Sequence, residues 1–164
     1  MVFGLLKRWR SLDLLIELTE SQVRVFSLSD DSQFSMIPHI AIETRKGQPF
    51  VKACGAEAVG MTGEGVRSEN PFDHPRSFVR DFYLAEKLLQ HAVFEIHNGK
   101  QRVAPRIIMH QREKLEGGLT HVEVRVLREL AFGAGARDVL IYVGEPLNPH
   151  STRYEDVIPL SISE

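Results

Sequence analysis

The sequence has few of the features that mark specialised classes of protein. Its single cysteine, Cys54, excludes an internal disulfide framework and suits a reducing compartment. No apolar run approaches the roughly 20 residues that a membrane-spanning helix needs, and no cleavage site for a secretory signal follows the start. The formal net charge of −2 gives no general attraction to nucleic acid, and the seven histidines lack the spacing of metal ligands. The 164 residues therefore predict a cytoplasmic protein of one domain's length, with no bound metal and no nucleic-acid partner.

The first ten residues combine apolar side chains at helical spacing with a basic cluster. The apolar residues recur at i, i+3, i+4 and i+7, and they are Val2, Leu5, Leu6 and Trp9. The basic residues are Lys7 and Arg8, and no acidic residue lies near them. This pattern is typical of a short amphipathic helix that lies on an anionic membrane surface. The alternative is that the apolar stripe folds back onto the protein's own core. We predict that residues 1–10 contact the inner face of the cytoplasmic membrane.

The next part of the chain has the alternation and the turn residues of antiparallel strands. Four strands are predicted, over residues 12–18, 23–28, 36–43 and 50–53. A polar turn at residues 19–22 joins the first two strands. A short helix over residues 55–61 and a loop rich in Gly and Pro over residues 63–76 follow.

The second part of the chain alternates helices with strands. Helices are predicted over residues 79–97 and 120–132, and strands over residues 106–109 and 139–143. The helices are expected to bury Phe82, Leu89, Val93 and Ile96 in the first and Val122, Val126 and Leu130 in the second. Strand, helix and strand in this order imply parallel pairing through a right-handed crossover. An antiparallel first part and a parallel second part predict a mixed sheet flanked by helices.

Residues 147–164 form a tail of different character. Pro146 and Pro149 prevent a helix from continuing directly after the last strand. Alternate apolar positions between residues 157 and 162 predict a strand at the edge of the sheet or one that covers it, and Pro159 confines such a strand to an edge. The alternative is a frayed terminus.

Five stretches occur in the order of a known family and share its residues at matching positions. The first is LIEL at residues 15–18, where the family has I-D-L. FYLAEKLLQH at residues 82–91 matches the helix that follows the family's D-G-V-I-A-D-F, and APRII at residues 104–108 matches its next strand. THVE at residues 120–123 and GAGARDV at residues 133–139 match the T-x-V-E-R-R helix and the G-A-G-A-R-E-V that ends it, and EP at residues 145–146 matches the end of E-E-P. On these motifs the chain resembles the MreB family of bacterial actins.

This resemblance implies the RNase H-like half of the actin fold, with a mixed five-stranded sheet and helices on both faces. The actin-like domain is expected to span residues 11–146, between the N-terminal segment and the tail. The resemblance also implies a relation to filaments that lie beneath the inner membrane and guide wall synthesis. The family holds ATP in a cleft between two similar halves, and 164 residues suffice for one half only.

The residues at the family's first phosphate loop depart from its pattern. Thr19 and Glu20 occupy the places of the family's Gly-Thr, and Glu17 replaces its metal-associated Asp. Glycine allows the backbone to come close to a phosphate, which threonine denies. A like charge at about 4 Å costs roughly 1 kcal/mol in water and about 4 kcal/mol near a protein surface, so Glu20 disfavours a triphosphate. We therefore predict a degenerate phosphate loop that holds no ATP and no magnesium.

Glu123 is the one candidate for a catalytic residue. The resemblance aligns it with the carboxylate that positions the attacking water in the family. Its place three residues after Thr120 also predicts a capping box, in which Thr120 caps the helix and Glu123 reaches back to the Thr120 backbone N–H. We favour the cap, because a base without a held phosphate has nothing to act on.

Together these features predict a non-enzymatic, MreB-like protein that acts by binding in cell-shape or envelope organisation. Its expected partners are a second copy, a filament-forming relative or an envelope protein, because an actin half without its mate exposes apolar surface. Contact with the membrane is expected to be weak. The alternative is a nucleotide-binding module, with ATP and Mg²⁺, that a second chain completes. A third possibility is a decayed gene product without a role.

Overall fold

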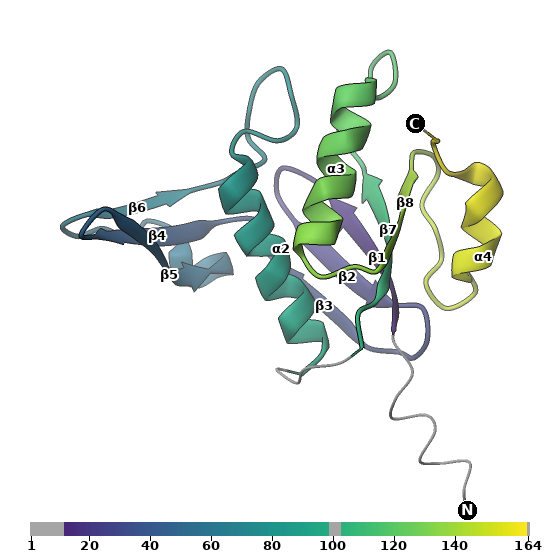
Figure 1. Ribbon diagram of the computed structural model, residues 1–164, viewed down its shortest axis with the longest axis horizontal. Helices are drawn as coiled ribbons and strands as arrows, with labels where there is room; N and C mark the ends of the chain where they lie inside the picture. The colour runs from purple at the N-terminus through teal and green to yellow at the C-terminus, as the bar shows by residue number, and fades with distance from the viewer. Residues whose placement is uncertain (1–11, 99–102, 164) are drawn as a thin grey trace, which may run out of the picture.

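A mixed five-stranded sheet forms the centre of the protein. The computed structural model describes residues 12–98 and 103–163, so the membrane-contact prediction for residues 1–10 lies outside the described residues. The strands of this sheet are β1 (Asp13–Leu18), β2 (Val23–Ser27), β3 (Gln33–Met36), β7 (Arg106–Gln111) and β8 (Asp138–Tyr142). They lie in the order β3-β2-β1-β7-β8, antiparallel among the first three and parallel from β1 to β8 (Figure 1). The predicted mixed five-stranded sheet is confirmed.

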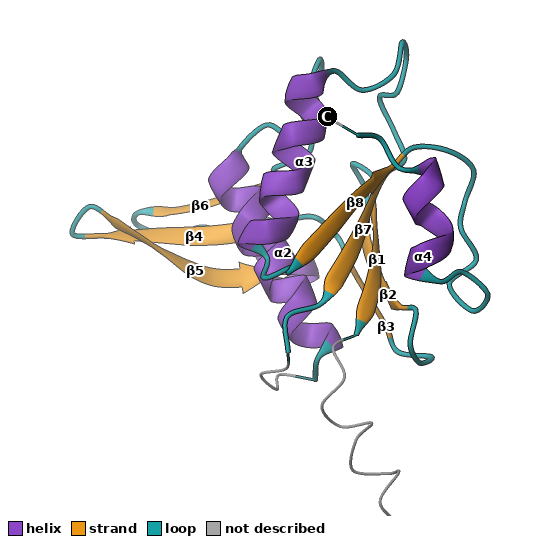
Figure 2. Ribbon diagram, turned by 45° about the vertical axis from the view of Figure 1, so that its right-hand side comes forward, coloured by secondary structure: helices purple, strands orange, loops and turns teal. Residues whose placement is uncertain are grey.

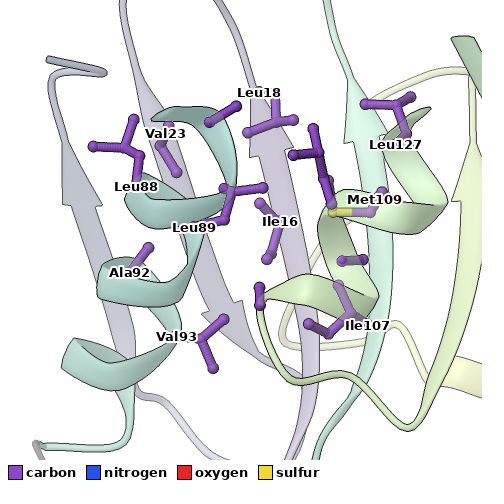
Figure 3. Packing of buried hydrophobic residues seen from close by; sticks show 14 of the residues in the cluster. Ile16, Leu18, Val23, Leu88, Leu89, Ala92, Val93, Ile107, Met109 and Leu127 are labelled. Atoms are coloured by element: carbon purple, nitrogen blue, oxygen red, sulfur yellow. The ribbon is translucent and has the colours of Figure 1, made fainter. Parts of the chain in front are cut away.

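Two helices cover one face of this sheet and form the main core with it. Helix α2 (Phe82–Ile96) begins at Asp81, whose Oδ1 accepts a hydrogen bond from the Leu84 backbone N–H at 2.9 Å. Helix α3 (His121–Gly133) begins at Thr120. Side chains alternate across a strand, so every second residue of β1 points toward these helices, and all three are 0% exposed: Leu14, Ile16 and Leu18. Figure 3 shows how the apolar side chains of α2 meet those of the strands in this layer.

The stripes that these helices bury differ in part from the predicted ones. Leu89, Val93, Ile96 and Leu130 are buried as expected. Phe82 and Val122, in the first turn of each helix, are instead 40% and 72% exposed. The predicted stripe was wrong there, because the buried face of α3 runs through Val124, Leu127, Leu130 and Ala131.

A short helix near the C-terminus covers the opposite face of the sheet. Helix α4 (Tyr154–Val157) runs into the 3₁₀ helix η3 (Ile158–Leu160), on the other side of the sheet from α2 and α3 (Figure 2). Tyr154 and Val157 are each 1% exposed and form a second core cluster with Leu15 of β1 and Ile108 of β7. The chain therefore packs its own side chains on both faces of the central sheet.

This arrangement corrects the prediction for the tail. The expected strand between residues 157 and 162 is wrong, and the frayed terminus is wrong as well, since α4 and η3 occupy this stretch. Tyr154 and Val157 are three residues apart, so one helical turn buries both side chains. One backbone hydrogen bond, from Ile162 N–H to Ile141 O at 2.8 Å, brings the end of the tail to the edge strand β8.

A smaller antiparallel sheet stands beside the central one. Its strands are β4 (Ile40–Arg45), β5 (Gln48–Cys54) and β6 (Val66–Glu69), in the order β5-β4-β6, with the 3₁₀ helix η2 (Gly55–Ala58) after β5. The single strand predicted over residues 36–43 is wrong, because the chain leaves one sheet at Met36 and enters the other at Ile40. Pro38 lies between them and has no N–H for a ladder. The loop predicted over residues 63–76 is wrong where it contains β6.

Candidate functional site

The turn between β1 and β2 holds the residues that were predicted to form a degenerate phosphate loop. Thr19 closes this turn with its own side chain. Its Oγ1 accepts a hydrogen bond from the Gln22 backbone N–H at 2.9 Å and donates one to the Gln22 carbonyl at 3.1 Å. The backbone N–H of Thr19 also donates to that carbonyl, at 3.0 Å. The threonine at the family's glycine position therefore makes a tight turn whose polar groups form hydrogen bonds with one another.

The backbone amide of Glu20 is already occupied by a carboxylate of the same chain. Glu20 N–H donates to Glu113 Oε2 at 2.7 Å, and the Glu20 carbonyl accepts from Asn70 Nδ2 at 2.7 Å. The Glu20 side chain forms an ion pair with Lys114 Nζ, which also donates to the carbonyl of His74. Every polar group of Glu20 thus has a partner from another part of the fold.

The segment that follows β7 delivers these partners. Arg112 N–H donates to the Leu18 carbonyl at 2.9 Å, which extends the parallel pairing of β1 and β7 by one bond. The side chain of Gln111 is 1% exposed, and its Nε2 donates to the Glu113 carbonyl at 2.8 Å. These bonds hold the segment beside the β1–β2 turn. Sequence analysis missed Glu113 and Lys114, because they lie more than 90 positions from Glu20 and no local pattern links them.

Glu17 lies just before the turn and is 4% exposed. Its Oε2 is 2.6 Å from Arg24 Nη2, and its Oε1 is 3.2 Å from Arg112 Nη1. The strand registers explain the contact with Arg24, since Glu17 stands opposite Arg24 on β2. On β7, Glu17 stands opposite His110, and Arg112 follows two residues later. Burying a carboxylate away from water is costly unless groups of opposite charge pair with it. Both oxygens that could have faced a metal ion are therefore bound by guanidinium groups.

His110 completes this buried cluster. Its side chain is 0% exposed, Nδ1 lies 3.8 Å from Glu17 Oε1, and Nε2 lies 3.1 Å from the Gly144 carbonyl. Burial lowers the pKa of His110 below its ordinary value, and the positive charge of Arg112 acts in the same direction. Within residues 12–98 and 103–163, no group of three His, Cys, Asp or Glu side chains could hold a metal ion.

Glu123 lies at the same edge of the sheet but serves the start of α3. Its Oε2 accepts from the Thr120 backbone N–H at 2.8 Å and from Thr120 Oγ1 at 2.7 Å, while Thr120 Oγ1 accepts from the Glu123 N–H at 3.2 Å. This is the predicted capping box. A cavity of 260 Å³ adjoins it, lined by apolar side chains such as Phe78 and Val126 and by Gln111.

The structure thus brings Glu17, Thr19 and Glu20 together at one end of β1. Glu123 belongs to the helix cap nearby. The residues predicted to touch the membrane lie outside the described residues. Within the described part of the chain, no helix has the length and apolar content to cross a bilayer.

The chain is similar to known proteins both in sequence and in fold. The chain is 31% identical over 152 residues to the cell shape-determining protein MreB of Escherichia coli strain K12, a match that covers 87% of this chain. The fold also matches MreB5 of Spiroplasma citri bound to ADP, with a TM-score of 0.61 and 18% identity over 81% of this chain. The chain is similar to MreB in sequence and has the fold of part of an actin-like protein. No protein-family model matches the sequence.

A second group of solved structures carries the same fold. A non-polymerising MamK mutant bound to AMPPNP matches with a TM-score of 0.63, at 20% identity over 82% of the chain and 41% of MamK. MamK has also been solved as a double helical filament, and that structure matches with a TM-score of 0.56 and 20% identity over 84% of this chain and 42% of that one. This MreB-like chain spans 42% of the Escherichia coli relative and 38% of MreB5.

Proposed function

We propose that this MreB-like chain is a non-catalytic binding protein in bacterial cell-shape or envelope organisation. The observation that carries the proposal is the hydrogen bond from Glu20 N–H to Glu113 Oε2, at 2.7 Å. A phosphate loop works by offering free backbone N–H groups to the phosphate. At this turn the amide already donates to an anion supplied by the protein.

The charges around the turn support the same conclusion. A triphosphate at the turn would meet the carboxylates of Glu20 and Glu113. Like charges about 4 Å apart near a protein surface repel by about 4 kcal/mol. The nearest cations offer no compensation, because Lys114 is paired with Glu20, and Arg24 and Arg112 are paired with Glu17. Nucleotide would have to break this network before it could bind.

The binding partners that we propose follow from the relatives. MamK assembles into a double helical filament, and the Escherichia coli relative determines cell shape. We propose that this chain associates with itself, with a filament-forming relative or with an envelope protein, in the cytoplasm. Residues 1–10 would add a weak membrane contact. Burying their four apolar side chains contributes roughly 6–12 kcal/mol, but ordering ten residues costs on the order of 10–20 kcal/mol, so several copies would have to bind together.

Titration calorimetry tests the nucleotide part of the proposal. We expect no heat of binding when Mg·ATP is added to the full chain. The matched positive control is MreB5 of Spiroplasma citri with AMPPNP, a complex that has been crystallised. Micromolar affinity at one site per chain would overturn the proposal. For the membrane part, a chain without residues 1–10 should no longer sediment with anionic vesicles, and unchanged sedimentation would refute that contact.

One observation favours a second candidate, a nucleotide-binding module that another chain completes. Glu123 stands at the edge of the sheet where the β1–β2 turn lies, beside a partly apolar cavity. If it were a catalytic base, Glu123→Ala would abolish nucleotide turnover in the two-chain complex without unfolding the protein. The capping box accounts for the Glu123 carboxylate without a reaction, and we therefore rank this candidate second.

A further inference from the structure

A groove of 740 Å³ lies among the described residues, and the proposed function does not use it. We call it the β3–β5 groove, because segments along β3 and β5 form two of its walls and α2 contributes a third. Figure 1 shows these three elements side by side at the junction of the two sheets. Both strands are the outer strands of their sheets. Ile37 and Val51, on opposite walls, are 44% and 45% exposed. Phe34 and Met36 also line the groove and pack against the main core.

The groove is lined by apolar and polar residues in similar measure, and it carries unpaired negative charge. Glu57 from η2 and Glu95 from α2 both line it. Within the described residues, neither carboxylate takes part in a side-chain hydrogen bond or an ion pair. Lys52 also lines the groove, and its Nζ lies 3.8 Å from Glu43 Oε2. The groove therefore suits an occupant that is apolar on one side and basic on the other.

We propose that residues 1–11 of the same chain dock in the β3–β5 groove. They carry four apolar side chains at helical spacing and three basic ones, with no acid: Val2, Leu5, Leu6 and Trp9, then Lys7, Arg8 and Arg10. This composition complements the groove in both respects. The β3–β5 groove is then the binding site of residues 1–11 whenever these residues do not lie on another surface.

The strand registers show that the segment is long enough to reach. Ile16 of β1 stands opposite Val25 of β2, and Val25 stands opposite Phe34 of β3. Phe34 is therefore two strand spacings across the sheet from β1, roughly 10 Å, and four residues, roughly 13 Å, along the strand direction from Leu12. Eleven extended residues span up to about 36 Å, and the same residues as a helix span about 16 Å.

The proposal has a consequence for membrane contact, and only this consequence rests on the proposed function. The same apolar stripe cannot face the groove and a lipid surface at once. Docking would therefore compete with membrane binding, and a change that weakens docking would strengthen binding to anionic lipid.

The fluorescence of Trp9 tests the docking directly, because Trp9 is the only tryptophan in the chain. In the full chain we expect its emission at a shorter wavelength, and its quenching by acrylamide to be weaker, than in a synthetic peptide of residues 1–11. The double variant Glu57→Lys/Glu95→Lys places positive charges opposite Lys7 and Arg8, and we expect it to shift both readings toward those of the peptide. The matched control is Glu116→Lys/Glu129→Lys, which reverses two exposed acids that do not line the groove.

Three results would overturn the docking. The first is Trp9 emission in the full chain equal to that of the peptide. The second is an equal response of the groove variant and the control, with circular dichroism showing both variants folded. The third is a shift that disappears on dilution, because it would place the segment in the groove of a second copy.

Vesicles of phosphatidylglycerol and phosphatidylcholine test the competition. We expect the groove variant to bind them more tightly than the parent chain and the control. If the fluorescence shift holds and vesicle binding is equal in all three proteins, the docking stands and the competition is refuted.

Discussion

Arg106 on β7 binds the carboxylate of Asp13 on β1 through two parallel hydrogen bonds, Nε to Oδ1 at 2.7 Å and Nη2 to Oδ2 at 2.6 Å. The same guanidinium reaches Glu155 Oε1 with Nη1 at 2.7 Å and lies over the Tyr154 ring at 4.3 Å from its centre. One side chain therefore links two parallel strands to α4. This link and the apolar contacts of Tyr154 hold the C-terminal helix on the second face of the sheet.

Replacing Arg106 by Ala should loosen α4 and destabilise the fold. The change leaves the Asp13 carboxylate, which is 20% exposed, without its bidentate partner. Hydrogen bonds to charged groups contribute roughly 1.5–3 kcal/mol each and are not additive, so we expect the free energy of unfolding to fall by about 3 kcal/mol. Urea denaturation followed by circular dichroism measures this loss.

Arg153→Ala is the control for Arg106→Ala. Arg153, the residue just before α4, pairs with Asp156 of that helix, but the two side chains are 76% and 46% exposed. Solvent screens such pairs, and we expect the urea midpoint to change little. Equal midpoints for the two variants would show that Arg106 does not hold α4 in place.

Thr120→Ala and Glu123→Ala should each weaken the start of α3 by a similar amount. Each variant removes one half of the capping box, and losing a cap costs about 1 kcal/mol. Thr120→Ser keeps a hydroxyl that accepts the N–H and should lie close to the parent protein in stability. Thermal unfolding of the three variants measures the differences. A Glu123→Ala protein as stable as the parent would leave the Glu123 carboxylate without a structural role and would favour the catalytic interpretation.

Local patterns predicted the features that depend on neighbouring residues. The capping box links residues three apart, and the apolar residues between 12 and 18 predicted the strand that the structure shows as β1. Two of the errors in strand placement also have local causes. Pro38 was a signal that the strand over residues 36–43 had to break, and Tyr154 with Val157 had helical spacing that alternation in the tail obscured.

The chemistry of the candidate site depended on contacts that no pattern contains. Thr19 and Glu20 could be recognised as departures from a phosphate loop, because they follow a strand that resembles the family. The carboxylate that accepts the Glu20 N–H, in the place where a phosphate would bind, comes from Glu113, 93 positions away. Its side chain reaches the turn only because β1 and β7 pair in parallel and end at the same edge of the sheet. A tertiary contact of this kind needs the fold before it can be seen.

His110 should make the protein less stable as the pH falls below neutrality. Burial lowers the pKa of His110 in the folded state below its ordinary value of 6.5. The unfolded state therefore takes up a proton first, and the free energy of unfolding falls as the pH drops through about 6.5 toward the pKa of the folded state. Urea midpoints measured from about pH 7 to about pH 5.5 report this slope.

His110→Gln removes the titrating ring but keeps a donor that can reach the Gly144 carbonyl. We expect its stability to depend less on pH than that of the parent chain over the same range. An identical pH dependence in both proteins would assign the slope to other groups.

Cys54 should react slowly with alkylating reagents while the protein is folded. Burial raises the pKa of its thiol from 9.0 to about 11, and the thiolate is the form that reacts. At pH 8 about a thousandth of the folded protein then carries a thiolate, against about a tenth of the protein unfolded in urea, so we expect alkylation by iodoacetamide to be ten- to a hundredfold slower in the folded chain. Mass spectrometry of timed samples measures both rates. Equal rates would show a reactive cysteine in the wall of the β3–β5 groove and would contradict the structural role that its burial supports.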